Sequence, residues 1–176
     1  MPSLGDPNFQ RTVVLIAAHS VEEGAFGLVI NRPIDVDLAE ILDELGLERP
    51  RGSFPPVLAD GPVEPGHGFV LFEADDRDVL GDDLDLPHGL RVSGSTETLA
   101  GLAGGDLSNR FSLILGYSGW YPGQLETEIE ENSWLIAPVA KSIVFDVPHE
   151  DRWVAALDSI GVDPGTIVDT GSSVPS

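Results

Sequence analysis

The sequence predicts a single domain of mixed α/β type, in which helices flank a mixed β-sheet. The chain has 176 residues, which is the usual size of one domain, and 41% of them are hydrophobic, enough to form one core. Short apolar runs rich in β-branched residues predict strands, and apolar residues at helical spacing predict helices. The two kinds of segment follow no regular βαβ repeat, so we expect a mixed sheet rather than a doubly wound parallel one.

The first half of the chain predicts a β-hairpin followed by a helix and two strands. Val13–Ala18 and Ala25–Ile30 are apolar runs joined by a short polar turn, which is typical of two antiparallel strands. Residues 37–46 carry apolar side chains at helical spacing, between an aspartate that can cap the helix and a glycine that can end it. Further strands are expected at Val57–Ala59 and Phe69–Phe72.

The second half begins with Asp75–Pro87, an aspartate-rich stretch that we interpret as a solvated acidic face or loop. Runs of β-branched and aromatic residues then predict strands at Leu90–Val92, Phe111–Leu115, Trp134–Ala137 and Ile143–Phe145. Segments with helical periodicity, bounded by proline or glycine, predict helices at Ser95–Gly104, from Pro122 to about Glu131, and from Pro148 to Gly161.

Charge is the strongest compositional signal. Thirty acidic residues against nine basic ones give a formal net charge of −21, and Lys141 is the one lysine among the basic residues. Self-repulsion of this size destabilises a compact chain at low salt, whereas the Debye length falls to about 3 Å at 1 M salt. The acidity and the scarcity of lysine together favour a halophilic, salt-accumulating source over an ordinary acidic protein. We therefore expect the melting temperature to rise between low and multimolar KCl, and an unchanged value would contradict this hypothesis.

Composition and motifs argue against several classes of function. The chain has no cysteine, which excludes disulfides and thiolate chemistry, and no apolar run near the ~20 residues that a membrane helix needs. Because no signal-peptide pattern is visible either, we expect a cytoplasmic protein that does not bind membranes. The basic residues are scattered, which disfavours direct binding of nucleic acid. There is no Walker loop, dinucleotide fingerprint or His-Glu-x-x-His motif, so we expect no cofactor and no metal.

The segment Gly116–Trp120 lies between a predicted strand and a predicted helix, where a nucleophile elbow would stand. That motif needs Gly-x-Ser-x-Gly, and Trp120 occupies the place of the last glycine. We therefore interpret the segment as a tight strand-to-helix turn, with Ser118 as a nucleophile the weaker alternative. His19 and His67 are separated in sequence; either the fold brings them into one site, or, as is more common, both lie on the surface.

A ligand site is suggested by two polar loops. Arg32 ends an apolar strand of a strongly acidic chain, where it either binds an anion or pairs with Asp35 or Glu40. Trp120 offers an aromatic wall, and the helix predicted after it offers backbone N–H groups to an anion. If the two loops converge, one cleft is formed by six residues: Asn31, Arg32, Tyr117, Trp120, Gln124 and Asn132.

Four segments that span nearly the whole chain carry a specific combination of motifs. They are Asp6–Phe9 leading into Thr12–Ile16, then Gly24–Pro33, then Gly61–Val63 with Gly68–Leu71, and last Gly116–Trp120 through Gly123–Glu126 to Leu135. With this set the chain resembles the YqgE/AlgH family of uncharacterised bacterial proteins. Each segment alone is modest, and the ordered set is what makes the resemblance specific.

The resemblance implies a fold in which the sheet forks and curls toward a partial barrel packed by helices. It implies no established activity, although a role in transcriptional regulation is attached to the name of some members. Two departures stand out. Family members usually carry a further strand before the position of Asp6–Phe9, where this chain has only a few residues, and they often have histidine where this chain has Glu73.

We therefore expect a non-catalytic cytoplasmic protein that binds a small ligand or another protein, with a role in regulation. The alternative is an enzyme that acts on a small anionic substrate held by Arg32 and the turn after Tyr117. A cleft with convergent polar groups would favour the enzyme, and an apolar patch would favour a protein partner.

Overall fold

Seven strands form one sheet in the parts of the chain that the structure describes, which are residues 11–49, 54–59, 63–74, 83–104 and 110–167 of a computed structural model. The strand order is β1-β2-β7-β4-β6-β5, and β3 pairs with β7 beside this path. The strands are β1 (Val14–Ser20), β2 (Gly24–Val29), β3 (Leu58–Ala59), β4 (Val63–Glu73), β5 (Leu84–Leu86), β6 (Leu90–Ser93) and β7 (Phe111–Trp120). The helices are α1 (Leu38–Glu44), α2 (Thr96–Gly104), α3 (Gln124–Glu130) and α4 (Arg152–Asp158).

The sheet forks at β7. This strand pairs with β4 and β2 in antiparallel fashion and with β3 in parallel fashion. A strand has only two edges, so β2 and β3 share one of them: β2 pairs with Ser118–Trp120 and β3 with Ile114–Leu115. The two terminal strands of the order, β1 and β5, contact each other, so the sheet curls into a nearly closed barrel. The mixed fold with a forked, curled sheet and flanking helices is thus confirmed.

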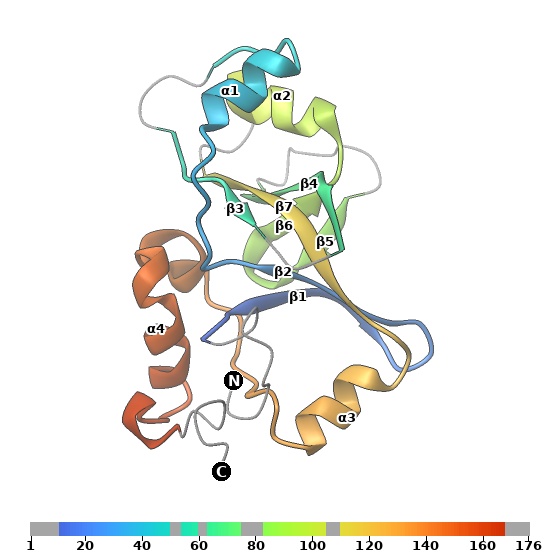
Figure 1. Cartoon of the computed structure of the whole chain (residues 1–176), viewed down its shortest axis with the longest axis vertical. Coiled ribbons are helices and arrows are strands. Elements are labelled where there is room, and N and C mark those ends of the chain that lie inside the picture. The colour runs from blue at the N-terminus through green and yellow to red at the C-terminus, as the bar shows by residue number, and fades with distance from the viewer. Residues whose placement is uncertain (1–10, 50–53, 60–62, 75–82, 105–109, 168–176) are drawn as a thin grey trace, which may run out of the picture.

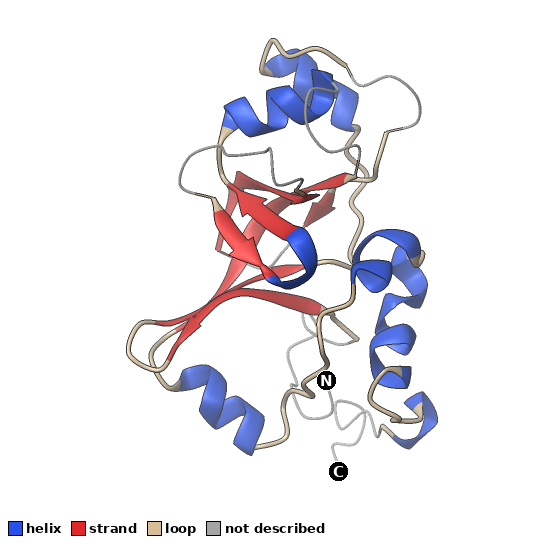
Figure 2. Ribbon diagram, turned by 180° about the vertical axis from the view of Figure 1, so that it is seen from behind, coloured by secondary structure: helices blue, strands red, loops and turns tan. Residues whose placement is uncertain are grey.

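Two apolar clusters stabilise this arrangement. Successive side chains of a strand point to opposite faces, so Val70 and Phe72 of β4 pack under α1 and α2, while Leu71 points into the barrel. Figures 1 and 2 both show α1 and α2 side by side over one end of the sheet, with α3 and α4 toward the other. Because both faces of β7 are covered, its first four residues are all buried.

Arg152 attaches α4 to the barrel. Its Nη1 donates a hydrogen bond of 2.6 Å to the carbonyl oxygen of Ile30, and its Nε donates one of 2.9 Å to that of Val147. Burial lowers the pKa of the guanidinium, and the two carbonyl groups accept from two of its five N–H donors. The helix is thereby fixed beside the residue that follows β2, next to the start of β1.

Four local expectations differ from the structure. Gly116–Trp120 is not a turn but the second half of β7, because Ser118–Trp120 pair with β2. The stretch expected as a solvated acidic face or loop contains β5, in which Leu86 packs against the barrel core. Trp134–Ala137 is not assigned as a strand, and no described strand pairs with it. Ile143–Phe145 belongs to a π-helical turn, Ser142–Asp146.

The remaining expected elements either agree with the structure or fall outside the described residues. The hairpin, the strands β3, β4 and β6, and the helices α1, α2, α3 and α4 agree in type with the expected segments. Asp6–Phe9 and most of the acidic stretch, residues 75–82, lie outside the described residues. Among the described helices, none has the length and apolar character required to cross a bilayer.

Candidate functional site

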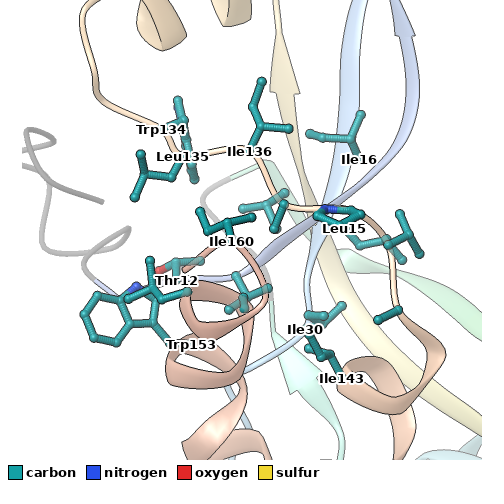
Figure 3. Close-up of a pocket in the computed structure, with 18 of the residues that line it drawn as sticks. Thr12, Leu15, Ile16, Ile30, Trp134, Leu135, Ile136, Ile143, Trp153 and Ile160 are labelled. Carbon is teal, nitrogen blue, oxygen red and sulfur yellow. The ribbon is translucent and has the colours of Figure 1, made fainter. Parts of the chain in front are cut away.

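An apolar pocket of about 380 Å³ lies between the first half of β1, α3, residues 134–140 and α4. This volume falls within the range of small-molecule sites, about 300–1,000 Å³. Figure 3 shows Trp153 and Ile160 on the α4 side of the pocket and Leu135 and Ile136 on the side of residues 134–140. The three tryptophans of the chain, Trp120, Trp134 and Trp153, all line it.

The position of the pocket follows from how the chain leaves β7. The strand ends at Trp120, α3 turns away, and residues 134–140 return in extended form across the start of β1 toward α4 (Figures 1 and 3). Leu135 and Ile136 remain 43% and 69% exposed, although they belong to an apolar run. Burying a side chain of this kind contributes about 1.5–3 kcal/mol. Residues 134–140 thus form an apolar wall of the pocket, and an apolar occupant would gain binding energy from contact with it.

Glu128 of α3 holds one end of that wall. Its Oε2 accepts hydrogen bonds from the indole nitrogens of Trp120, at 2.9 Å, and Trp134, at 2.7 Å. Its Oε1 accepts a third, of 3.0 Å, from Nε2 of Gln124. The two indole rings meet edge to face with centroids 5.8 Å apart. One carboxylate thus joins β7, α3 and the first residue of the 134–140 segment.

Glu73 holds the other end. Its carboxylate accepts a hydrogen bond of 2.6 Å from Nζ of Lys141 and lies 3.7 Å from Nη1 of Arg110. The Lys141 hydrogen bond is the largest cause that lowers the pKa of Glu73. Glu73 thereby anchors the residue that directly follows the 134–140 segment. The wall of the pocket is therefore tethered at both ends.

His19 and Glu126 form the polar part of the lining. His19, on β1, and Glu126, on α3, make a short hydrogen bond through Nε2 and Oε1, and both side chains are partly exposed. This hydrogen bond is the largest cause that lowers the pKa of Glu126, so the carboxylate is ionised at neutral pH. Among the described lining residues, Glu126 is the one carboxylate, and neither arginine nor lysine occurs.

The structure brings together part of the expected site. Trp120 and Gln124 meet at Glu128, and Trp120 lines the pocket. The amide oxygen of Gln124 accepts a hydrogen bond from the backbone N–H of Tyr121. In the turn before α3, this N–H group therefore already has a partner. Asn132, exposed and with a φ of 59°, lies just beyond the end of α3, where its N–H donates to the carbonyl oxygen of Ile129.

The remaining expected residues lie elsewhere. Tyr117 packs its ring against Phe26, with centroids 5.3 Å apart, in the core of the barrel. Asn31 joins the residues before β1, since its Oδ1 accepts from Val13 N at 2.9 Å and its Nδ2 donates to Arg11 O at 2.8 Å. These contacts give Asn31 a structural role at the start of the sheet.

Arg32 and Trp120 lie beside different parts of β7, Arg32 near its middle and Trp120 at its end. The carbonyl oxygen of Arg32 accepts from Ala59, which pairs with Leu115 of β7, whereas Trp120 ends that strand. The preceding residue pair, Leu58 and Ile114, is roughly 20 Å from Trp120 at the usual rise of a strand. The two loops therefore do not form one cleft.

The structure also locates the candidate nucleophile, Ser118, and the two candidate histidines, His19 and His67. Ser118 is buried within the β2–β7 pairing, where an incoming substrate has no access to a nucleophile. His67 lies on β4 with its ring centroid 4.7 Å from that of Phe69, while His19 pairs with Glu126. The structure thus gives the two histidines different partners. Glu126 and Glu128 were not singled out by sequence reasoning, because carboxylates are too abundant in this chain for any one to be distinctive.

A model of the AlgH-like family matches residues 1–165. The chain belongs to this family. A UPF0301 protein of Magnetococcus marinus is 42% identical over 169 residues, which cover 96% of this chain and 89% of the relative. A UPF0301 protein of Ralstonia nicotianae is 44% identical over 169 residues, covering 95% and 87%. The expected membership of the YqgE/AlgH family is confirmed.

Two solved structures share the fold of this AlgH-like chain. The solution structure of the AlgH protein from Pseudomonas aeruginosa has a TM-score of 0.75 and 38% identity, and the match covers 93% of this chain and 86% of that one. The crystal structure of a Corynebacterium diphtheriae protein has a TM-score of 0.71, with 98% and 87% covered. At 22% identity, this second likeness shows the fold alone. None of these names states an activity.

Proposed function

We propose that this AlgH-like chain is a non-catalytic binding protein whose pocket between β1, α3 and α4 takes an apolar ligand. The observation that carries the proposal is the lining, in which three tryptophans and a run of aliphatic side chains surround about 380 Å³. Apolar pockets with a few polar groups are typical of ligand sites. The ligand gains its affinity from burial of apolar surface, at roughly 25 cal/mol per Å².

The alternative drawn from the sequence, an enzyme that acts on a small anionic substrate, has weaker support. An anion is best held by arginine, lysine or free backbone N–H groups. The described lining offers neither of these cations, and Arg32 lies beside the middle of β7, outside the lining. The occupant that fits this lining is apolar, and we rank the anionic substrate second.

A regulatory role would act through occupancy of this pocket. With a net charge of −21 the chain repels nucleic acid, so regulation by direct contact with DNA is disfavoured. We place the protein in the cytoplasm. Its reducing conditions do not affect the stability of a chain that has no cysteine and so no disulfide. A ligand that stabilises the pocket wall would then alter the outer surface of residues 134–140, which is available to a protein partner.

The test uses 1-octanol as a neutral apolar probe and the fluorescence of the three tryptophans as the readout. Ala156 of α4 lines the pocket, so Ala156→Phe fills part of it. We expect octanol to change the emission of the wild-type chain and to bind at least tenfold more weakly to the variant, which corresponds to about 1.4 kcal/mol.

Val154→Phe is the matched control. Val154 lies on the same helix, is 40% exposed and does not line the pocket, so its octanol affinity should equal that of the wild type. Circular dichroism and the melting temperature show whether each variant is folded. Equal octanol binding by both folded variants, or no binding by the wild type, would contradict the proposed function.

A further inference from the structure

The lining of the pocket is electrically one-sided. Glu126, the one carboxylate among the described lining residues, is 32% exposed in its side chain, and His19 beside it is 43% exposed, so the pair stands between the apolar interior and solvent. No arginine or lysine of the described chain lines the pocket. Arg11 holds its guanidinium 5.3 Å from the ring centroid of Trp153 but does not itself belong to the lining.

Glu126 retains capacity to bind a further donor. A carboxylate has roughly four acceptor positions, and His19 is the one side chain among the described residues that donates to it. When the imidazole is neutral and donates its Nε2–H, the pair as a whole carries one negative charge. The field of a chain with a net charge of −21 adds to that charge. A cationic donor is therefore attracted to this position, and a second carboxylate is repelled.

We infer that the pocket takes an amphiphilic amine, with its alkyl or aryl body against the three tryptophans and its ammonium group on Glu126. This inference rests on the proposed function, because it names the ligand class of the same pocket. The ammonium donates to the free acceptor positions of Glu126, while His19 keeps its own hydrogen bond. The aromatic walls also suit a cation, since the faces of indole rings attract positive charge.

The experiment compares three probes with the same eight-carbon body and different head groups: octylamine, 1-octanol and octanoate. Binding is measured by tryptophan fluorescence and by calorimetry, below the concentrations at which the probes form micelles. A charge-assisted hydrogen bond is stronger than one between neutral groups, and exposure to solvent weakens it. Because Glu126 is one-third exposed, we expect octylamine to bind only about tenfold more tightly than octanol. Octanoate should bind more weakly than octanol.

Glu126→Gln removes the charge and keeps the shape of the side chain. We expect it to abolish the preference for octylamine, so that octylamine and octanol bind to the variant with equal affinity. Glu130→Gln is the control, since Glu130 is an exposed carboxylate of the same helix that does not line the pocket. It should preserve the preference for the amine, and so exclude an effect of net charge alone.

The outcomes separate this inference from the proposed function. Octylamine and octanol binding equally well would overturn the amine and leave an apolar pocket. Octanoate binding tightest would also overturn it, and would indicate that Arg11 directs the head group. Loss of the amine preference in both variants would assign it to the overall field instead of to Glu126. If none of the three probes binds, the proposed function itself fails.

Discussion

Replacing Gly24 by alanine is expected to destabilise this protein more than any other single change considered. Gly24 opens β2 with a φ of +100°, a conformation that side-chain-bearing residues rarely adopt. A Cβ at this position would lie 2.1 Å from the backbone oxygen of Trp120, which cannot move without breaking the β2–β7 pairing. Strain and overlap together cost about 4 kcal/mol. The melting temperature should fall by roughly 10 °C.

Gly46→Ala is the matched control for this change. Gly46 also has a positive φ, of +69°, but a Cβ there would meet no atom within 4 Å. Only the backbone strain remains, at about 1–2 kcal/mol. The measurement is the midpoint of urea unfolding for both variants. Equal losses would show that the approach of Trp120 to Gly24 contributes nothing.

Glu128→Ala is expected to produce the second-largest effect, in stability and in the pocket together. The change leaves the indole N–H groups of Trp120 and Trp134 without their common acceptor. Trp120 is 7% exposed, so water does not readily replace the lost partner. An orphaned buried donor costs about 1–3 kcal/mol, and we expect a total loss of about 3 kcal/mol in the free energy of unfolding. Because both indole rings line the pocket, octanol should also bind more weakly.

Urea unfolding and the wavelength of tryptophan emission test this expectation. Glu128→Gln keeps an acceptor oxygen and should lose less than the alanine variant. Glu130→Ala removes an exposed carboxylate from the same helix and should change stability by no more than about 0.5 kcal/mol. If Glu130→Ala matched Glu128→Ala, the loss would reflect helix α3 in general and not the two indole hydrogen bonds.

The local sequence pattern is sufficient to predict those helices and strands that depend on contacts between neighbouring residues. The helix α1 begins where Asp37 caps it, with Oδ1 accepting from Ala39 N at 2.9 Å, and such capping is readable from the sequence. The hairpin of β1 and β2 is likewise local. By contrast, Trp134–Ala137 has the composition of a strand, but a strand also needs a partner, and the described chain provides none. The glycines of Gly116–Trp120 suggested a turn, yet pairing with β2 keeps this segment extended.

The candidate site was only partly predictable for a related reason. Trp120 and Gln124 stand close in sequence, and the structure keeps them together at Glu128. Arg32 was placed beside them on the assumption that two loops meet, and the register of β3 on β7 puts it elsewhere. Nothing in the sequence distinguishes Glu126 from the other acidic residues, because its role depends on His19, which is far away in the chain.

The family, the mixed fold, the strong acidity and the lack of cysteine chemistry follow from residue types and their order, and could be inferred without a structure. Three features emerge only in the folded chain: β7 forks between β2 and β3, Gly24 accommodates the oxygen of Trp120, and β1, α3 and α4 enclose a pocket. These features depend on contacts between segments that are distant in the sequence. Such contacts are fixed by strand register and packing, which local propensity does not encode.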